Sequence, residues 1–96
     1  MLYNMRKKKS TKEYAVKIQR ILALSDWTQD HMADLLGVSN ITMSWWARGR
    51  RTPKERYITR IDFMYEGIVV PHEAGLRESA DRVEREILEG YLRGKD

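Results

Sequence analysis

Residues 28–46 read TQDHMADLLGVSNITMSWW, and they predict two short helices joined by a tight turn. Thr28 can cap the first helix, because its hydroxyl can accept an N–H that has no partner within the helix. Gly37 stands where a chain leaving a helix commonly needs a positive φ, and Ser39 can cap the second helix. The apolar residues between these signals follow the 3.6-residue period of a helix; they are Met32, Ala33, Leu35, Leu36, Met43 and Trp46.

The same reasoning predicts helices on both sides of this pair and hence an all-α fold. An apolar stripe indicates a helix over 11–23, and the cap-like run Thr52-Pro53-Lys54-Glu55 predicts the start of another over 53–65. Beyond this four-helix domain, we expect a short extended segment over 68–71 and one long helix over 72–92. The expected divisions of the chain are a flexible basic arm at 1–9, a compact domain at 10–66 and an extension at 67–96.

Composition narrows the class of protein. The 96 residues suffice for one small domain, and without cysteine the chain forms no disulfide and no cysteine-based metal site. No apolar run approaches the length of a membrane span. The lack of cysteine is compatible with a reducing cytoplasm, where we expect the protein. Residues 1–60 hold 13 Lys/Arg against 5 Asp/Glu, a balance of +8, whereas residues 61–96 hold 5 against 9, a balance of −4. The basic half contains the predicted helix pair, as expected for a DNA-binding face.

From about residue 18 to residue 65 the chain resembles the DNA-binding domain of the Cro/phage-repressor family, the Xre-like helix-turn-helix group. The carriers are Thr28-Gln29, Ala33, Gly37-Val38-Ser39, Thr42, Ser44, Trp46 and Arg48-Gly49-Arg50-Arg51-Thr52-Pro53. Ala47 and Leu22 depart from the family, which often has a Glu–Arg pair at these positions. The resemblance implies that the second helix enters the major groove of double-stranded DNA. It also implies a sequence-specific transcriptional regulator, a homodimeric repressor of phage or mobile-element type that can repress its own operon.

Two groups of residues are expected to contact DNA. The exposed face of the second helix is expected to read bases, through Asn40, Ile41, Ser44 and Trp45. Two kinds of group are expected to bind phosphates: the helix N-termini, and the residues toward the end of the second helix and in the loop after it. The residues are Thr28, Gln29, Ser39, Thr42, Arg48, Arg50, Arg51 and Lys54. For Trp45 an equal alternative is that it packs against the C-terminal segment of its own chain or against a partner subunit.

The C-terminal part carries a narrow apolar seam typical of a helix that pairs with another helix. We expect it to form the homodimer interface, through Leu76, Ala80, Val83, Ile87 and Tyr91. A second hypothesis is an antitoxin-type protein whose acidic C-terminal helix binds a protein partner while the other half binds DNA. No residues are spaced as a catalytic or metal-binding set, so we expect neither an enzyme nor a cofactor.

Overall fold

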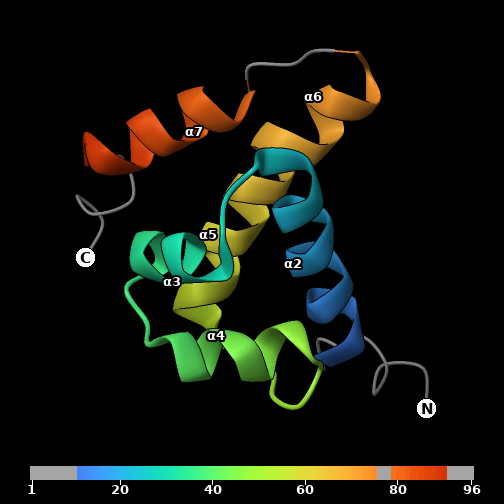
Figure 1. The fold of residues 1–96 in the computed structure, drawn as a ribbon, viewed down its shortest axis with the longest axis vertical. Coiled ribbons are helices and arrows are strands. Elements are labelled where there is room, and N and C mark those ends of the chain that lie inside the picture. The colour runs from blue at the N-terminus through green and yellow to red at the C-terminus, as the bar shows by residue number, and fades with distance from the viewer. Residues whose placement is uncertain (1–10, 76–78, 91–96) are drawn as a thin grey trace.

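The computed structural model describes residues 11–75 and 79–90, and every regular element within them is a helix (Figure 1). The expected all-α class is therefore confirmed for this part of the chain. The arm expected at 1–9, together with Leu76 and Tyr91, lies outside the described residues. In chain order the elements are α2 (Thr11–Ser25), α3 (Gln29–Leu36), α4 (Asn40–Ala47), α5 (Glu55–Met64), η1 (Tyr65–Val69), α6 (Val70–Glu73) and α7 (Ser79–Leu88).

The first described helix, α2, forms one wall of the core. Its residues Tyr14, Ile18 and Ile21 share one face at helical spacing, and each is at most 1% exposed. The helix runs two residues beyond its expected end, to Ser25, whose buried hydroxyl accepts the backbone N–H of Trp27 at 3.0 Å. This bond holds the link to α3 close to the core, and it explains why Trp27 is buried there.

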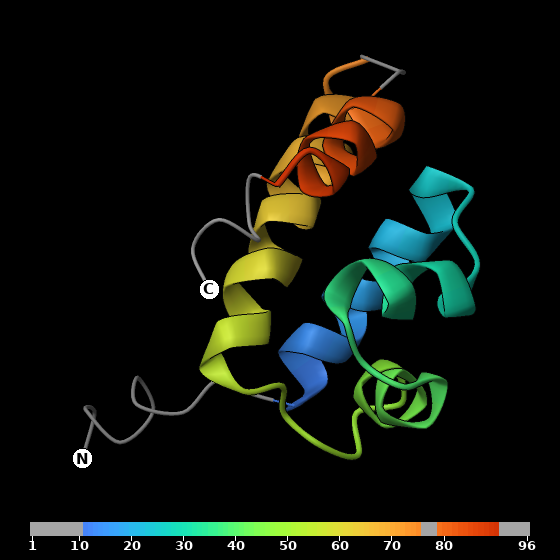
Figure 2. The ribbon, with the colours of Figure 1, turned by 90° about the vertical axis from the view of Figure 1, so that its left-hand side faces the viewer.

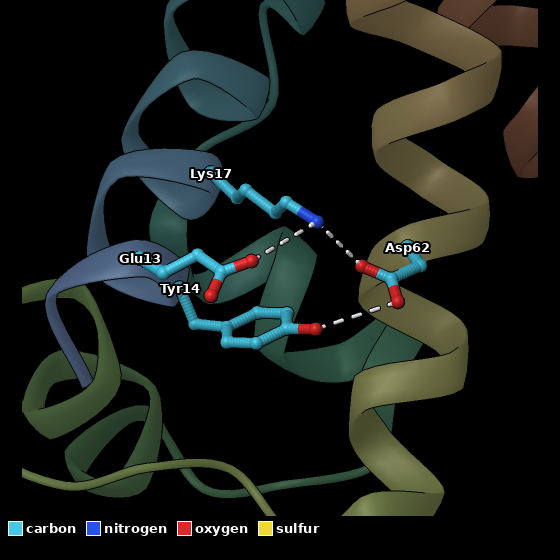
Figure 3. Close-up of polar contacts among 4 residues, drawn as sticks. All are labelled: Glu13, Tyr14, Lys17 and Asp62. Atoms are coloured by element: carbon cyan, nitrogen blue, oxygen red, sulfur yellow. Dashed lines mark hydrogen bonds and ion pairs between the residues drawn. The ribbon is translucent and has the colours of Figure 1, made fainter. Parts of the chain in front are cut away.

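A small polar cluster joins α2 to α5 (Figure 3). The Lys17 ammonium lies 3.0 Å from a carboxylate oxygen of Asp62 and 3.9 Å from one of Glu13. The Tyr14 hydroxyl donates to the other oxygen of Asp62 at 3.4 Å. Burial of the phenol, and after it the negative charge of Asp62, raises the pKa of Tyr14 to about 12.

The helix that begins at Glu55 continues through η1 and α6 to Glu73, where the sequence predicted an extended segment over 68–71. That prediction is wrong, because burial outweighs the effect of two helix breakers. Ile68 and Val69 are at most 1% exposed, and burying such side chains contributes roughly 1.5–3 kcal/mol each. A glycine within a helix costs only about 1 kcal/mol. The π-helical segment η1 ends at Val69, two residues before Pro71, which has no N–H to donate to a helix.

The last described helix, α7, lies against η1 and α3 at the end of the molecule opposite to α4 (Figures 1 and 2). The prediction of a single helix over 72–92 is wrong, because the chain turns at Ala74 and Gly75, where φ is 91°. Gly67 permits the close approach of α7. A Cβ atom at this position would lie 2.4 Å from Cγ2 of Val83.

The described residues of the apolar seam that was assigned to a dimer interface are covered by their own chain. Val83 and Ile87 are 2% and 4% exposed and belong to the same core as α2–α5, and Ala80 packs against that core. The core therefore extends beyond residue 65 into η1 and α7, and Val83 and Ile87 offer little exposed surface for a contact between subunits. The boundary expected after residue 66 falls within a helix and does not separate two cores.

Candidate nucleic-acid interface

Local hydrogen bonds fix the α3–α4 pair as the sequence predicted. Oγ1 of Thr28 accepts the backbone N–H of His31 at 3.0 Å. Oγ of Ser39 accepts that of Thr42 at 3.1 Å. Between the helices, Gly37 has a φ of 79°, the left-handed conformation that glycine adopts without strain. Both caps and the turn are therefore confirmed, and they hold the two short helices at a defined angle.

The two sides of α4 have opposite characters. Met43, Trp46 and Ala47 face the core and are buried, as expected for Trp46. The other side carries the four side chains assigned to base reading, of which Ser44 is half-buried and three are exposed: Asn40, Ile41 and Trp45. Ile41 is 64% exposed, so α4 presents a free surface with both polar and apolar groups.

A hydrogen bond between side chains joins the first residues of α3 and α4. Nε2 of Gln29 donates to Oδ1 of Asn40 at 3.0 Å. An amide oxygen has two lone pairs and an amide nitrogen has two protons. The bond therefore orients the Asn40 amide and leaves it one acceptor site and the Nδ2 donors for another ligand.

Trp45 stands at the edge of this surface, with the Arg51 guanidinium 4.5 Å from its ring centroid. The α7 helix lies at the other end of the molecule (Figure 1), so this part of the C-terminal segment does not cover Trp45; residues 91–96 lie outside the described part of the chain. The ring is 36% exposed, and the stacked arginine shields part of it. Trp45 and Arg51 thus form one unit on the surface.

The segment that follows α4, residues 48–54, carries four cations and contains no acidic residue. Residues 37–54 include no Asp or Glu. Within the described part of the chain, no carboxylate forms an ion pair with its four exposed cations, Arg48, Arg50, Arg51 and Lys54. Elsewhere Lys17 is paired with Asp62, and Arg20 with Glu73. Carboxylates of the same chain therefore neutralise Lys17 and Arg20 on α2, whereas no described carboxylate pairs with the cations beside α4.

One expected detail of this segment is wrong. The helix α5 begins at Glu55, two residues later than predicted, and Lys54 is its N-cap without a side-chain hydrogen bond. Pro53 lies before the helix and is buried, so its ring serves packing and does not open the first turn. Thr52 consequently does not cap α5, and it remains in the segment beside α4.

Long side chains of α2 and α5 donate hydrogen bonds to the α3–α4 pair. The sequence did not predict these contacts. Nε2 of Gln19 donates to the carbonyl of Ala47 at 2.7 Å, and Nη1 of Arg60 donates to that of Leu36 at 3.3 Å. Both carbonyls lie at helix C-termini, where they lack helical partners. In addition, Nε2 of His31 lies 3.1 Å from a carboxylate oxygen of Glu84 on α7. No local pattern could have indicated these contacts, because they link residues far apart in sequence.

Comparison with known proteins finds no family model, no curated protein and no solved structure that matches the chain. Within the described residues, no helix is both long enough and apolar enough to span a membrane. The features of the molecule that indicate a function are the exposed face of α4 and the basic segment beside it.

Proposed function

We propose that the protein is a sequence-specific DNA-binding transcriptional regulator whose α3–α4 pair acts as a helix-turn-helix, with α4 in the major groove. The observation that carries this proposal is the side-by-side arrangement of two features. One is the exposed face of α4, with Asn40 oriented by Gln29. The other is a segment of four exposed cations that no described carboxylate neutralises.

The α4 surface has the groups that base reading requires. An asparagine amide can donate to N7 and accept from N6 of adenine at once, and an apolar side chain can contact the methyl group of thymine. Asn40 and Ile41 supply these two kinds of contact from neighbouring positions on the first turn of α4. Ser44, one turn later, has a hydroxyl that bonds either a base or a phosphate.

The neighbouring groups suit the DNA backbone. Gln29 opens α3, where its amide and the free N–H groups of the helix can both meet a phosphate. The exposed cations after α4 supply the attraction that makes binding strong and dependent on salt. Two copies on a two-fold operator would extend the short sequence that one copy reads. Any contact between the copies involves surfaces other than the buried Val83–Ile87 seam.

Selection of bound duplexes from a random pool tests the proposal. We expect a defined motif to be enriched. Asn40→Ala should weaken binding to the enriched duplex by about 5- to 150-fold, which corresponds to about 1–3 kcal/mol, and should leave binding to a mixed-sequence duplex nearly unchanged. Asp81→Ala, a change at an exposed position on α7, is the control. A pool without enrichment, or equal losses on both duplexes, would contradict sequence-specific binding through α4.

A further inference from the structure

An open pocket of ≈ 420 Å³ lies beside α4, between this helix, the segment 48–54 and the first turn of α5. Trp45 forms one wall, and Trp46 and Tyr57, whose rings are 5.3 Å apart, line another part. Three cations also line the pocket, Arg51, Lys54 and Arg56. Trp45 belongs both to the pocket and to the exposed face of α4, so a ligand in the pocket lies directly beside a ligand bound to α4.

Two of these cations are held by aromatic rings. Arg51 lies over the ring of Trp45 at 4.5 Å and Arg56 over the ring of Tyr57 at 5.3 Å, measured from the guanidinium carbon to the ring centroid. A ring attracts the charge of a guanidinium without accepting all of its N–H groups, so N–H groups remain available to oxygen acceptors. The rings thereby limit the freedom of two arginines without satisfying their hydrogen-bond donors.

No described carboxylate neutralises the cations of the pocket. Glu55 lies between Lys54 and Arg56 in the sequence, but it forms no ion pair with either of them in the structure. An open pocket with aromatic walls and a positive rim suits a ligand that is part sugar and part phosphate, since the sugar packs on a ring while the phosphate accepts the arginine N–H groups.

We propose that this pocket takes one deoxyribose-phosphate unit of the DNA backbone at the edge of the groove that α4 enters. The inference rests on the proposed function and extends it by assigning a role to Trp45. This residue packs on the sugar and holds Arg51 toward the phosphate, so it positions the protein on the backbone and does not read a base. Arg56, which the sequence did not indicate, joins the phosphate-binding set.

The first test measures how affinity for a mixed-sequence duplex depends on salt. The slope of log K against log salt is negative, and each lost phosphate contact makes it less steep by about 0.9. Arg51→Ala and Arg56→Ala should each make the slope less steep by about this amount. Arg85→Ala, which removes the same charge from an exposed position on α7, should leave the slope nearly unchanged. Equal effects of all three variants would overturn the assignment of the pocket, because binding would then follow net charge alone.

The second test neutralises one phosphate at a time in the duplex enriched by selection, using methylphosphonate linkages. One linkage should weaken wild-type binding and have a clearly smaller effect on Arg51→Ala and on Trp45→Ala. Trp45→Phe, which keeps an aromatic wall, should behave like the wild type. A change of preferred base in Trp45→Ala, with the same sensitivity to every linkage as the wild type, would overturn the inference while the proposed function stands. A wild-type protein that binds no duplex would overturn the proposed function itself.

Discussion

Gln29 and Asn40 show how a single hydrogen bond can prepare a residue for its ligand. Because Gln29 donates to Oδ1 of Asn40 at 3.0 Å, removing Gln29 should free the Asn40 amide to rotate. We predict that Gln29→Ala and Asn40→Ala together weaken binding to the enriched duplex by clearly less than the sum of the two separate losses, as measured in a double-mutant cycle. The coupling should amount to about 0.5 kcal/mol or more.

Ile41 provides the control for this cycle. Its side chain is 64% exposed, and it contains no group that could share the amide hydrogen bond. Ile41→Ala should therefore combine additively with Gln29→Ala, within about 0.5 kcal/mol. Additive losses for the Gln29 and Asn40 pair as well would mean that the bond in the free protein does not persist on DNA.

The buried phenol of Tyr14 gives a prediction for alkaline stability. Its pKa is raised from 10.0 to about 12 in the folded protein, first by burial and then by Asp62. Neutral Tyr14 therefore stabilises the fold fully below the unfolded pKa of 10.0, and this contribution is lost as the pH rises through about 12. As the pH rises from 10.0 to about 12, the free energy of unfolding of the wild type should therefore fall by roughly 2 kcal/mol relative to that of Tyr14→Phe.

Denaturant unfolding of both proteins across this pH range measures the difference. All other titratable groups are present in both proteins, so the comparison isolates the contribution of residue 14. Loss of the 3.4 Å hydrogen bond to Asp62 should lower the stability of Tyr14→Phe by a roughly constant amount below pH 10.0. Curves that stay parallel up to the highest pH would show that the phenol ionises as easily in the folded protein as in the unfolded one.

At the scale of elements, the contact between η1 and α7 depends on one missing side chain. Gly67 lies within a helix, where alanine alone would stabilise by about 1 kcal/mol. A Cβ at this position would lie 2.4 Å from Cγ2 of Val83, so either the Val83 side chain or α7 would have to shift. We predict that Gly67→Ala instead lowers the free energy of unfolding by about 1–3 kcal/mol, the usual effect of overpacking a core. A denaturant titration measures the sign of the change. A loss of stability agrees with the close contact, and a gain contradicts it.

A second variant links this result to the contact itself. Val83→Ala removes the methyl group that a Cβ at residue 67 would meet, although it also leaves a small cavity. The double variant Gly67→Ala/Val83→Ala should therefore be more stable than the sum of the two single changes predicts. Strict additivity would indicate that α7 does not approach η1 as closely as the structure shows.

The elements that the sequence predicted correctly are those whose ends depend on neighbouring residues. Thr28, Gly37 and Ser39 each act within three or four residues of their own position, so their chemistry can be recognised locally. The helix through Gly67 and Pro71 could not be predicted in this way, because its stability comes from burial against α2 and α7. The face of α4 was likewise predictable from helical spacing, whereas the stacking of Arg51 on Trp45 depends on the path of the loop.

At the scale of the whole molecule, α7 completes the core that also supports the α3–α4 pair. Val83 and Ile87 are buried in that core, and Glu84 contacts His31 on α3 at 3.1 Å. The helix α4 with the segment 48–54 that follows it, and the helix α7, lie at opposite ends of the molecule (Figure 1). A change in the buried seam of α7 should therefore affect the stability of the entire fold, including the distant α4 surface.

Two substitutions on α7 test this dependence. Val83→Asp places a carboxylate in a site that is 2% exposed, where an unpaired charge costs about 3–5 kcal/mol. Leu88→Asp places the same group at a position that is 55% exposed, where it should cost about 1 kcal/mol or less, part of it from the C-terminal helix dipole. Denaturant unfolding and sedimentation of both variants should show a large loss of stability for Val83→Asp alone. If Val83→Asp instead kept its stability and changed only the state of association, residue 83 would lie at a contact between subunits, as its sequence pattern alone suggests.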